Sequence, residues 1–133
     1  MESAALALAT MLAATSPLLA QNPIAPQDKA IAPPGGIFKG EGGEAVFKKL
    51  CAACHMPDGS GYQGLYPALA KNAHLAQPGY PILVIVNGQN AMPAVGAMLS
   101  DQQIADVVNY LRTNLGNRYK ATTKPADVAA FRH

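Results

Sequence analysis

The feature that most constrains this chain is the segment Cys51–His55, in which two cysteines lie three positions apart and a histidine follows directly. These are the only two cysteines among 133 residues, so the chain cannot be a disulfide-rich scaffold. Half of the residues are apolar and 14% are charged, which allows a folded core and argues against global disorder. The formal net charge of +2 is too small to indicate a nucleic-acid-binding protein.

The C-x-x-C-H spacing is typical of covalent c-type haem attachment. Cys51 and Cys54 can each add to one vinyl group of a haem, and His55 then lies beneath the ring, where an imidazole can bind iron. Three alternatives are a redox-active dithiol, a zinc site and a plain disulfide. A dithiol of this kind expects a βαβ context, and a zinc site usually needs a second Cys/His pair. His74 and His133 are isolated, so haem attachment is the favoured interpretation.

A methionine sulfur is the ligand expected at the second axial position of the iron. The chain offers Met1, Met11, Met56, Met92 and Met98. The first two fall in a suspected leader, and the third is adjacent to His55. Met92 lies in a loop bounded by Gly, Asn and Pro residues, whereas Met98 is expected to pack under the helix that follows it. We therefore expect Met92 to bind the iron, although either methionine could simply fill core space.

Two segments carry helical patterns. In Gly42–Cys51 the apolar residues Val46, Phe47 and Leu50 gather on one face. In Ser100–Leu115, Ser100 is a helix-capping residue and Gln103 completes a capping box. The apolar stripe of this second helix is formed by Ile104, Val107, Val108, Leu111 and Leu115.

The other segments predict loops or short elements. Met56–Gly64 is rich in turn residues and is expected to be a loop, while Pro67–Ala70 predicts a short helical turn. The β-branched run within Gly79–Asn87 leaves a short helix and a short strand both open. A further helical turn is expected between Pro125 and Phe131.

Residues 1–20 are expected to be a signal peptide. The apolar run Ala4–Ala14 has the length of a signal hydrophobic region, and Ala20 offers a small residue at the cleavage site. The basic residues that usually precede such a run are missing. A buried N-terminal helix and a retained membrane anchor are the alternatives. Residues 21–36 contain four prolines and end in Gly-Gly, which predicts an extended arm.

The sequence resembles a class I, single-haem c-type cytochrome. The matching stretches occur in family order and are Gly43, Phe47, Cys51–His55, Tyr66–Leu69, Met92–Ala94 and Leu99–Arg112. The resemblance implies a small all-α cytochrome c fold, with about three to five helices around one covalently bound haem c. The cytochrome c domain is then expected at residues 37–116, with a C-terminal tail at 117–133.

The resemblance also implies roles for individual residues. In the family, a small residue and an aromatic residue of the first helix meet an aromatic residue of the last, and Gly43, Phe47 and Tyr110 match those positions. Pro67 matches the proline whose carbonyl receives the other N–H of the ligand imidazole, a bond that fixes the ring orientation. Without that role Pro67 would only form a turn. The implied cofactor-binding residues are Cys51, Cys54, His55, Pro67 and Met92, of which His55 and Met92 bind the iron.

The C-terminal region is similar to the cytochrome c subunits of bacterial periplasmic or membrane-bound dehydrogenases, through Leu115–Asn117, Pro125–Val128 and Arg132. The resemblance implies that a flavin, molybdenum or quinone catalytic subunit passes electrons to this chain in the periplasm. The chain would pass them to an acceptor in the respiratory chain. It is expected to be an electron-transfer protein and not an enzyme, with no nucleic-acid partner and with membrane association only through partners or an uncleaved leader.

Three other functions are open at this stage. The chain could be a free periplasmic carrier, or a small haem peroxidase, which needs an open axial position and a distal acid–base group such as His74. It could also be a gas sensor, which needs Met92 to be absent or displaced. For electron transfer we expect a mainly apolar docking face near Ala52, Ala53, Met56 and residues 92–95, with weak salt dependence. The arm 21–36 and the tail 117–133 are expected to act as straps to a partner.

Overall fold

The computed structural model describes residues 37–132, so the expected leader and arm at 1–36 lie outside the described residues. The described part is helical, and its β-structure is limited to two isolated bridges, which confirms the all-α prediction. No helix in this part is long and apolar enough to cross a membrane. The elements in chain order are α1 (Gly43–Val46), η1 (Phe47–Cys51), α2 (Ala52–His55), η2 (Ala73–Ala76), α3 (Gly79–Asn87), η3 (Val95–Met98), α4 (Asp101–Thr113) and α5 (Pro125–Ala129).

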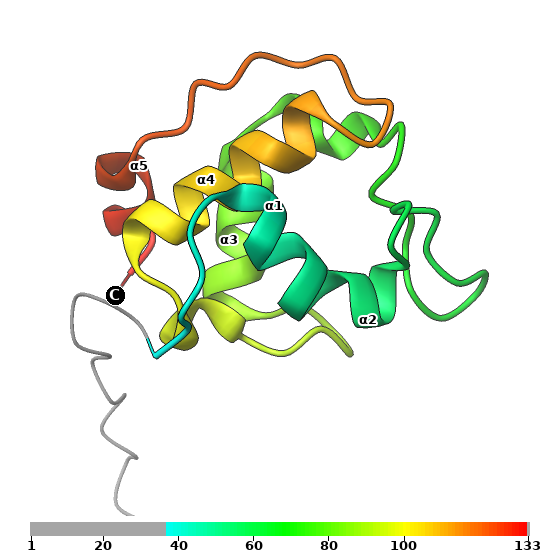
Figure 1. Cartoon of the computed structure of the whole chain (residues 1–133), viewed down its shortest axis with the longest axis horizontal. Coiled ribbons are helices and arrows are strands. Elements are labelled where there is room, and N and C mark those ends of the chain that lie inside the picture. The colour runs from blue at the N-terminus through cyan, green and yellow to red at the C-terminus, as the bar shows by residue number, and fades with distance from the viewer. Residues whose placement is uncertain (1–36, 133) are drawn as a thin grey trace, which may run out of the picture.

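The first three elements form one helical run that crosses α4 (Figure 1). Its middle turn, η1, is π-helical, so the run continues to His55, four residues beyond the predicted end at Cys51. At the crossing, the ring centroids of Phe47 and Tyr110 lie 5.5 Å apart. Gly43 allows this approach, because a Cβ atom there would lie only 2.6 Å from the Cβ of Tyr110. The expected small-residue and aromatic crossing is therefore present.

Helix α4 has the capping box and the apolar stripe that its sequence predicts. The Ser100 side chain accepts a hydrogen bond from the backbone N–H of Gln103, and the Gln103 side chain accepts one from the backbone N–H of Ser100. The buried stripe consists of Ile104, Val107, Val108 and Leu111, with Leu115 packed partly buried beyond the helix end. Gln103 also donates to the carbonyls of Phe38 and Gly40, which fastens the start of the described chain to this helix.

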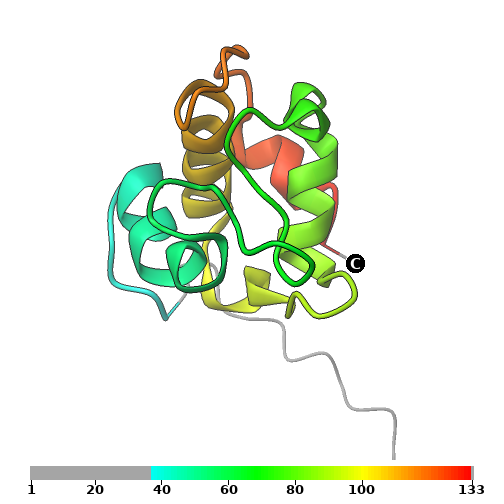
Figure 2. The same ribbon diagram turned by 90° about the vertical axis from the view of Figure 1, so that its right-hand side faces the viewer.

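Helix α3 settles the segment that the sequence left open. Ile82 and Ile85 are buried against the core, while Leu83 is 47% exposed. Figure 2 shows α3 on one side of the molecule and the α1–α2 run on the other, with the loop that follows α2 passing between them. The prediction of a helical turn at Pro67–Ala70 is wrong, because residues 67–69 have no regular secondary structure. The backbone N–H groups of Leu69 and Ala70 donate instead to the carbonyl of Gly59 in the preceding loop.

The C-terminal segment folds back onto its own domain. Helix α5 packs against α4, and Val128 is fully buried there (Figure 1). Arg132 reaches the N-terminal end of α4 and forms an ion pair with Asp101. The segment 117–132 is thus part of the folded domain, and its contact with a partner stays a prediction.

Candidate haem-binding site

A cavity of about 420 Å³ lies between α2, the loop that follows it, α3 and the loop that carries Met92. Its walls are mainly apolar, and no Asp, Glu, Lys or Arg from the described chain lines it. All five residues that the sequence nominated line this cavity: Cys51, Cys54, His55, Pro67 and Met92. The fold thus brings together residues separated by up to 41 positions in the chain.

His55 is held in one orientation at the end of α2. Its side chain is buried, with 7% exposed, and Nδ1 lies 2.8 Å from the carbonyl oxygen of Pro67. Because a carbonyl can only accept, Nδ1 carries the proton and Nε2 of the neutral ring keeps its lone pair. Nε2 forms no hydrogen bond within residues 37–132. The imidazole is therefore prepared to bind a metal through Nε2.

The loop from Met56 to Ala70 positions the Pro67 carbonyl. The backbone N–H of Gly61 donates to the carbonyl of His55, which ties the loop to the end of α2. Gly61 has φ +70°, and a Cβ there would lie 2.7 Å from the carbonyl carbon of Pro67. Only glycine permits both this left-handed backbone and this close approach. The loop brings Pro67 to His55 by backbone packing, not by a helical turn.

Asn117 supports the same loop from the C-terminal segment. Its side chain is 5% exposed and donates 2.8 Å hydrogen bonds to the carbonyls of Leu69 and Leu111. Its side-chain oxygen accepts from the backbone N–H of Asn72 at 2.8 Å. The sequence analysis included Asn117 in the family-like C-terminal stretch but assigned it no role, because two of its partners, Leu69 and Asn72, lie more than 40 positions away.

The Met92 loop is a tight turn closed by two backbone hydrogen bonds between Gln89 and Met92, of 3.0 and 2.9 Å. Gly88, at φ +73°, lets the chain turn where a Cβ would meet the Met92 carbonyl at 2.8 Å. The Tyr80 hydroxyl, 3.0 Å from the Gln89 side-chain oxygen, joins the turn to α3. Met92 is half-buried at the cavity wall, whereas Met98 lies in η3 and does not line the cavity.

The two cysteines are not joined in a disulfide and are both half-buried. Burial, with a smaller contribution from neighbouring Cys54, raises the pKa of the Cys51 thiol to about 11. Reactive dithiols depend on the opposite effect, a lowered thiol pKa that supplies thiolate at neutral pH. The environment of Cys51 therefore argues against the redox-dithiol alternative.

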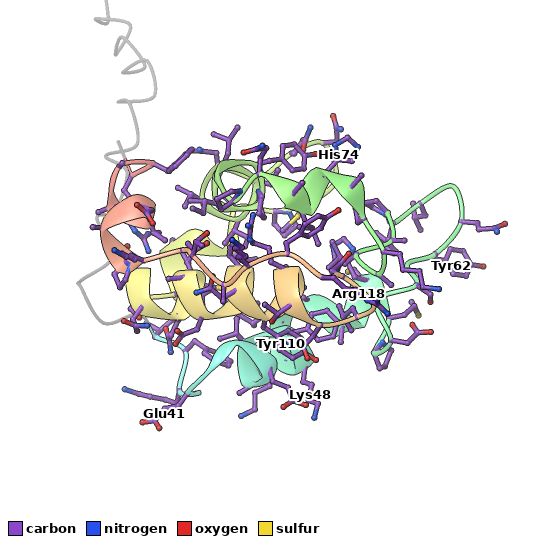
Figure 3. The ribbon with its side chains drawn as sticks, turned by 90° about the horizontal axis from the view of Figure 1, so that it is seen from above. Glu41, Lys48, Tyr62, His74, Tyr110 and Arg118 are labelled. Carbon is purple, nitrogen blue, oxygen red and sulfur yellow. The ribbon has the colours of Figure 1, made fainter. Side chains whose placement is uncertain are left out.

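His74 lies at the rim of the cavity, where it stacks on Tyr80 with ring centroids 5.4 Å apart. His74 belongs to η2, and its side chain is exposed (Figure 3). Arg112, which the sequence analysis did not single out, is buried next to Leu111, a residue that lines the cavity. It donates to the carbonyls of Leu75, Ala76 and Lys120 and so ties η2 and the C-terminal segment to α4.

The residues around the cavity fit a covalently attached haem. Two thiols three positions apart in the chain, a fixed imidazole with an available Nε2 and a thioether sulfur share one largely apolar cavity. Together with the all-α fold, this set defines a single-haem, class I c-type cytochrome.

Comparison with known proteins identifies the family. The model described as cytochrome C oxidase, cbb3-type, subunit III matches residues 39–111, so the chain belongs to this cytochrome c family. The chain accordingly binds one haem c covalently and has an electron-transfer role.

Two groups of relatives share this domain. The gluconate 2-dehydrogenase cytochrome c subunit of Pantoea cypripedii is 39% identical over 72% of this chain and 26% of its own length. The cytochrome c subunit of a quinone alcohol dehydrogenase from Gluconacetobacter polyoxogenes is 38% identical over 68% of this chain and 22% of its length. Cytochrome c6 of Bumilleriopsis filiformis is 40% identical over 53% of this chain and 86% of its own. The chain thus spans about a quarter of the dehydrogenase subunits that it matches.

Proposed function

We propose that this chain accepts electrons from the catalytic subunit of a dehydrogenase and passes them to the respiratory chain. The observation that carries the proposal is the similarity to cytochrome subunits named for gluconate, quinone-dependent alcohol and fructose dehydrogenases. We infer that the partner belongs to the flavin, molybdenum or quinone type. Because the chain spans only part of these relatives, the partner is assigned by chemical class and not by substrate.

Within this proposal, each of the five cavity residues has one task. Cys51 and Cys54 form the thioether bonds, and His55 Nε2 and the Met92 sulfur are the two protein ligands of the iron. The carbonyl of Pro67 holds the imidazole by accepting the Nδ1 proton at 2.8 Å. That bond also increases the basicity of the ligating nitrogen.

The bound haem c supplies a one-electron iron couple, and the chain sets the environment of that couple. The cavity lacks charged side chains from the described chain and is lined mainly by apolar groups. A low-dielectric site disfavours the form with the larger net charge, so burial favours the reduced iron. With both axial positions filled by His55 and Met92, no position is left for a substrate. We therefore propose an electron carrier and not an enzyme.

We further propose that the chain works in the periplasm. The support is the apolar run at Ala4–Ala14, which has the length of a signal-peptide hydrophobic region. This run belongs to residues 1–36, outside the described structure.

A free periplasmic carrier is the second candidate. The similarity to cytochrome c6 supports it, because the match covers 86% of that relative, which is nearly a whole protein. In this case the chain would meet donor and acceptor in turn and would not remain bound to a dehydrogenase.

Reconstitution separates the two candidates. The holoprotein, made in a host that matures c-type cytochromes, is mixed with the catalytic subunits of gluconate, alcohol and fructose dehydrogenases and their substrates. Haem reduction is followed by absorbance, and association is followed by size-exclusion chromatography. The proposal expects rapid reduction by at least one of them, with a complex that survives chromatography. Reduction by ascorbate but by none of the dehydrogenases would contradict it and favour the free carrier.

A further inference from the structure

Arg132, at the end of the described chain, connects two other segments through one guanidinium group. Its Nε lies 2.5 Å from an Asp101 carboxylate oxygen at the first turn of α4. Its two terminal nitrogens donate to the carbonyls of Gly96 at 3.0 Å and Leu99 at 2.7 Å. The side chains of Arg132 and Asp101 are 31% and 33% exposed, so the contact is largely shielded. We call this set of three bonds the Arg132 clamp.

The clamp acts on the segment that directly follows Met92. Gly96 belongs to η3 and is buried against α3, where a Cβ would lie only 2.7 Å from the Cα of Val86. Pro93 and Val95, between Met92 and Gly96, both line the cavity. A shift of η3 would therefore move the backbone of residues 93–95 and, with it, the position of the Met92 side chain in the cavity.

The upstream side of the Met92 loop has weaker long-range support. The Gln89–Met92 hydrogen bonds close the turn but join it to nothing else, and the Tyr80–Gln89 contact is exposed. Downstream, the backbone N–H of Phe38 donates to the carbonyl of Met98 at 3.1 Å. Arg132 supplies the only charge-assisted bonds to residues 95–99 within residues 37–132, one to Gly96 in η3 and one to Leu99 directly after it. Such bonds are stronger than neutral ones.

We propose that Arg132 is a positioning residue for Met92: by clamping η3 to α4, it sets how firmly the Met92 sulfur stays on the iron. This inference depends on the proposed role of Met92 as an iron ligand. Arginine is suited to the task because its planar fork can meet a carboxylate and two carbonyls at once, which the single ammonium of lysine cannot do. Asp101 fixes the orientation of that fork.

The test measures how readily an added ligand replaces the methionine. Full-length ferric holoprotein is titrated with imidazole, and binding is followed by the haem absorbance. A looser η3 leaves the methionine off the iron for a larger fraction of the time, and the apparent imidazole affinity rises in the same proportion. Arg132→Ala is expected to tighten imidazole binding by about tenfold. Arg132→Lys should lie between this variant and the wild type, because it keeps the ion pair but loses part of the fork.

Arg118→Ala is the matched control. Arg118 is an exposed arginine of the same C-terminal segment, and it forms no ion pair or side-chain hydrogen bond with the described chain (Figure 3). The Arg118→Ala substitution removes the same charge as Arg132→Ala but no contact with η3. The imidazole affinity of this variant should therefore stay within about twofold of the wild type. Hydrogen exchange provides a second measurement. In Arg132→Ala, amides of residues 95–99 should exchange faster while those of α4 keep their protection.

Three results would overturn the proposal or its basis. If Arg132→Ala lowers the melting temperature but leaves imidazole affinity unchanged, the clamp is merely structural. If Arg132→Ala yields no holoprotein, Asp101→Asn replaces it, and an affinity equal to that of the wild type again rejects the proposal. If Met92→Ala binds imidazole no more tightly than the wild type, the assignment of Met92 as a ligand fails, whatever Arg132 does.

Discussion

The Nδ1 atom of His55 lies 2.8 Å from the carbonyl oxygen of Pro67, twelve positions further along the chain. Because the acceptor is a backbone atom, no side-chain deletion at residue 67 removes it. The bond depends on the position of the loop, and that position depends on Asn117, whose buried side chain joins the loop to the end of α4. The orientation of the His55 imidazole is therefore supported by a residue outside the cavity, Asn117 of the C-terminal segment.

Replacing Asn117 by alanine should destabilise the holoprotein by about 1–3 kcal/mol, because it leaves buried backbone groups without partners. Denaturant unfolding, followed by the haem absorbance, measures the change. Asn114→Ala is the control, because Asn114 is exposed and its loss should change stability by less than about 0.5 kcal/mol. Equal effects of the two variants would show that Asn117 does not support the loop.

Gly43→Ala should destabilise the protein, against the trend expected from helix propensity. Propensity alone predicts a gain of about 0.5–1 kcal/mol. The added Cβ, however, would meet the Tyr110 Cβ at 2.6 Å, and overpacking of this kind costs about 1–3 kcal/mol. Gly79→Ala is the control, because Gly79 is also the first residue of a helix and its added Cβ would meet only the Phe131 ring, at 3.3 Å. A gain in stability for Gly43→Ala would mean that α1 and α4 cross with more space.

Val128→Ala tests whether the C-terminal segment belongs to the folded domain. Val128 is fully buried against the core, so its truncation should cost about 2 kcal/mol. Thr122→Ala, at an exposed position of the same segment, should cost less than about 0.5 kcal/mol. Thermal unfolding of the two variants gives the comparison. A neutral Val128→Ala would indicate that the segment is a passive end.

Local patterns predicted the parts of the fold whose causes are local. The α4 helix follows from a capping box three residues apart and an apolar stripe, and both are legible in a single stretch of sequence. Cys51, Cys54 and His55 were found because their spacing is typical of covalent haem attachment, whereas Pro67 was found through the family resemblance. Met92 was separated from Met98 by its loop context, and the structure places only Met92 at the cavity wall.

The remainder depends on contacts that sequence patterns do not encode. The β-branched run of α3 suits helix and strand equally, and packing of Ile82 and Ile85 decides between them. Ala52, expected on the docking face, is instead buried in the core, because the helical run continues past Cys51. Arg132 was noted only as part of a family-like stretch, since its partners lie more than 30 positions away.

The exposed side chains at the cavity mouth predict an apolar docking face. Leu65 and Tyr80 line the cavity and are 59% and 41% exposed. Electron self-exchange, measured by NMR line broadening, should therefore change by less than about threefold between low salt and ~0.5 M salt. Leu65→Lys should slow this exchange several-fold, whereas Ile37→Lys, at an exposed residue away from the cavity, should not. A steep salt dependence would indicate a charged docking face.

The identity of the axial ligands tests the account most directly. Ferric holoproteins of Met92→Ala and Met98→Ala are compared with the wild type by absorption spectroscopy, under conditions where all three are folded and carry the haem. The account predicts that Met92→Ala loses the weak charge-transfer absorption of sulfur-bound ferric haem and has a lower reduction potential. Met98→Ala should retain both properties, because Met98 lies in η3 and off the cavity wall. Persistence of the absorption in Met92→Ala, or its loss in Met98→Ala alone, would contradict the proposed site.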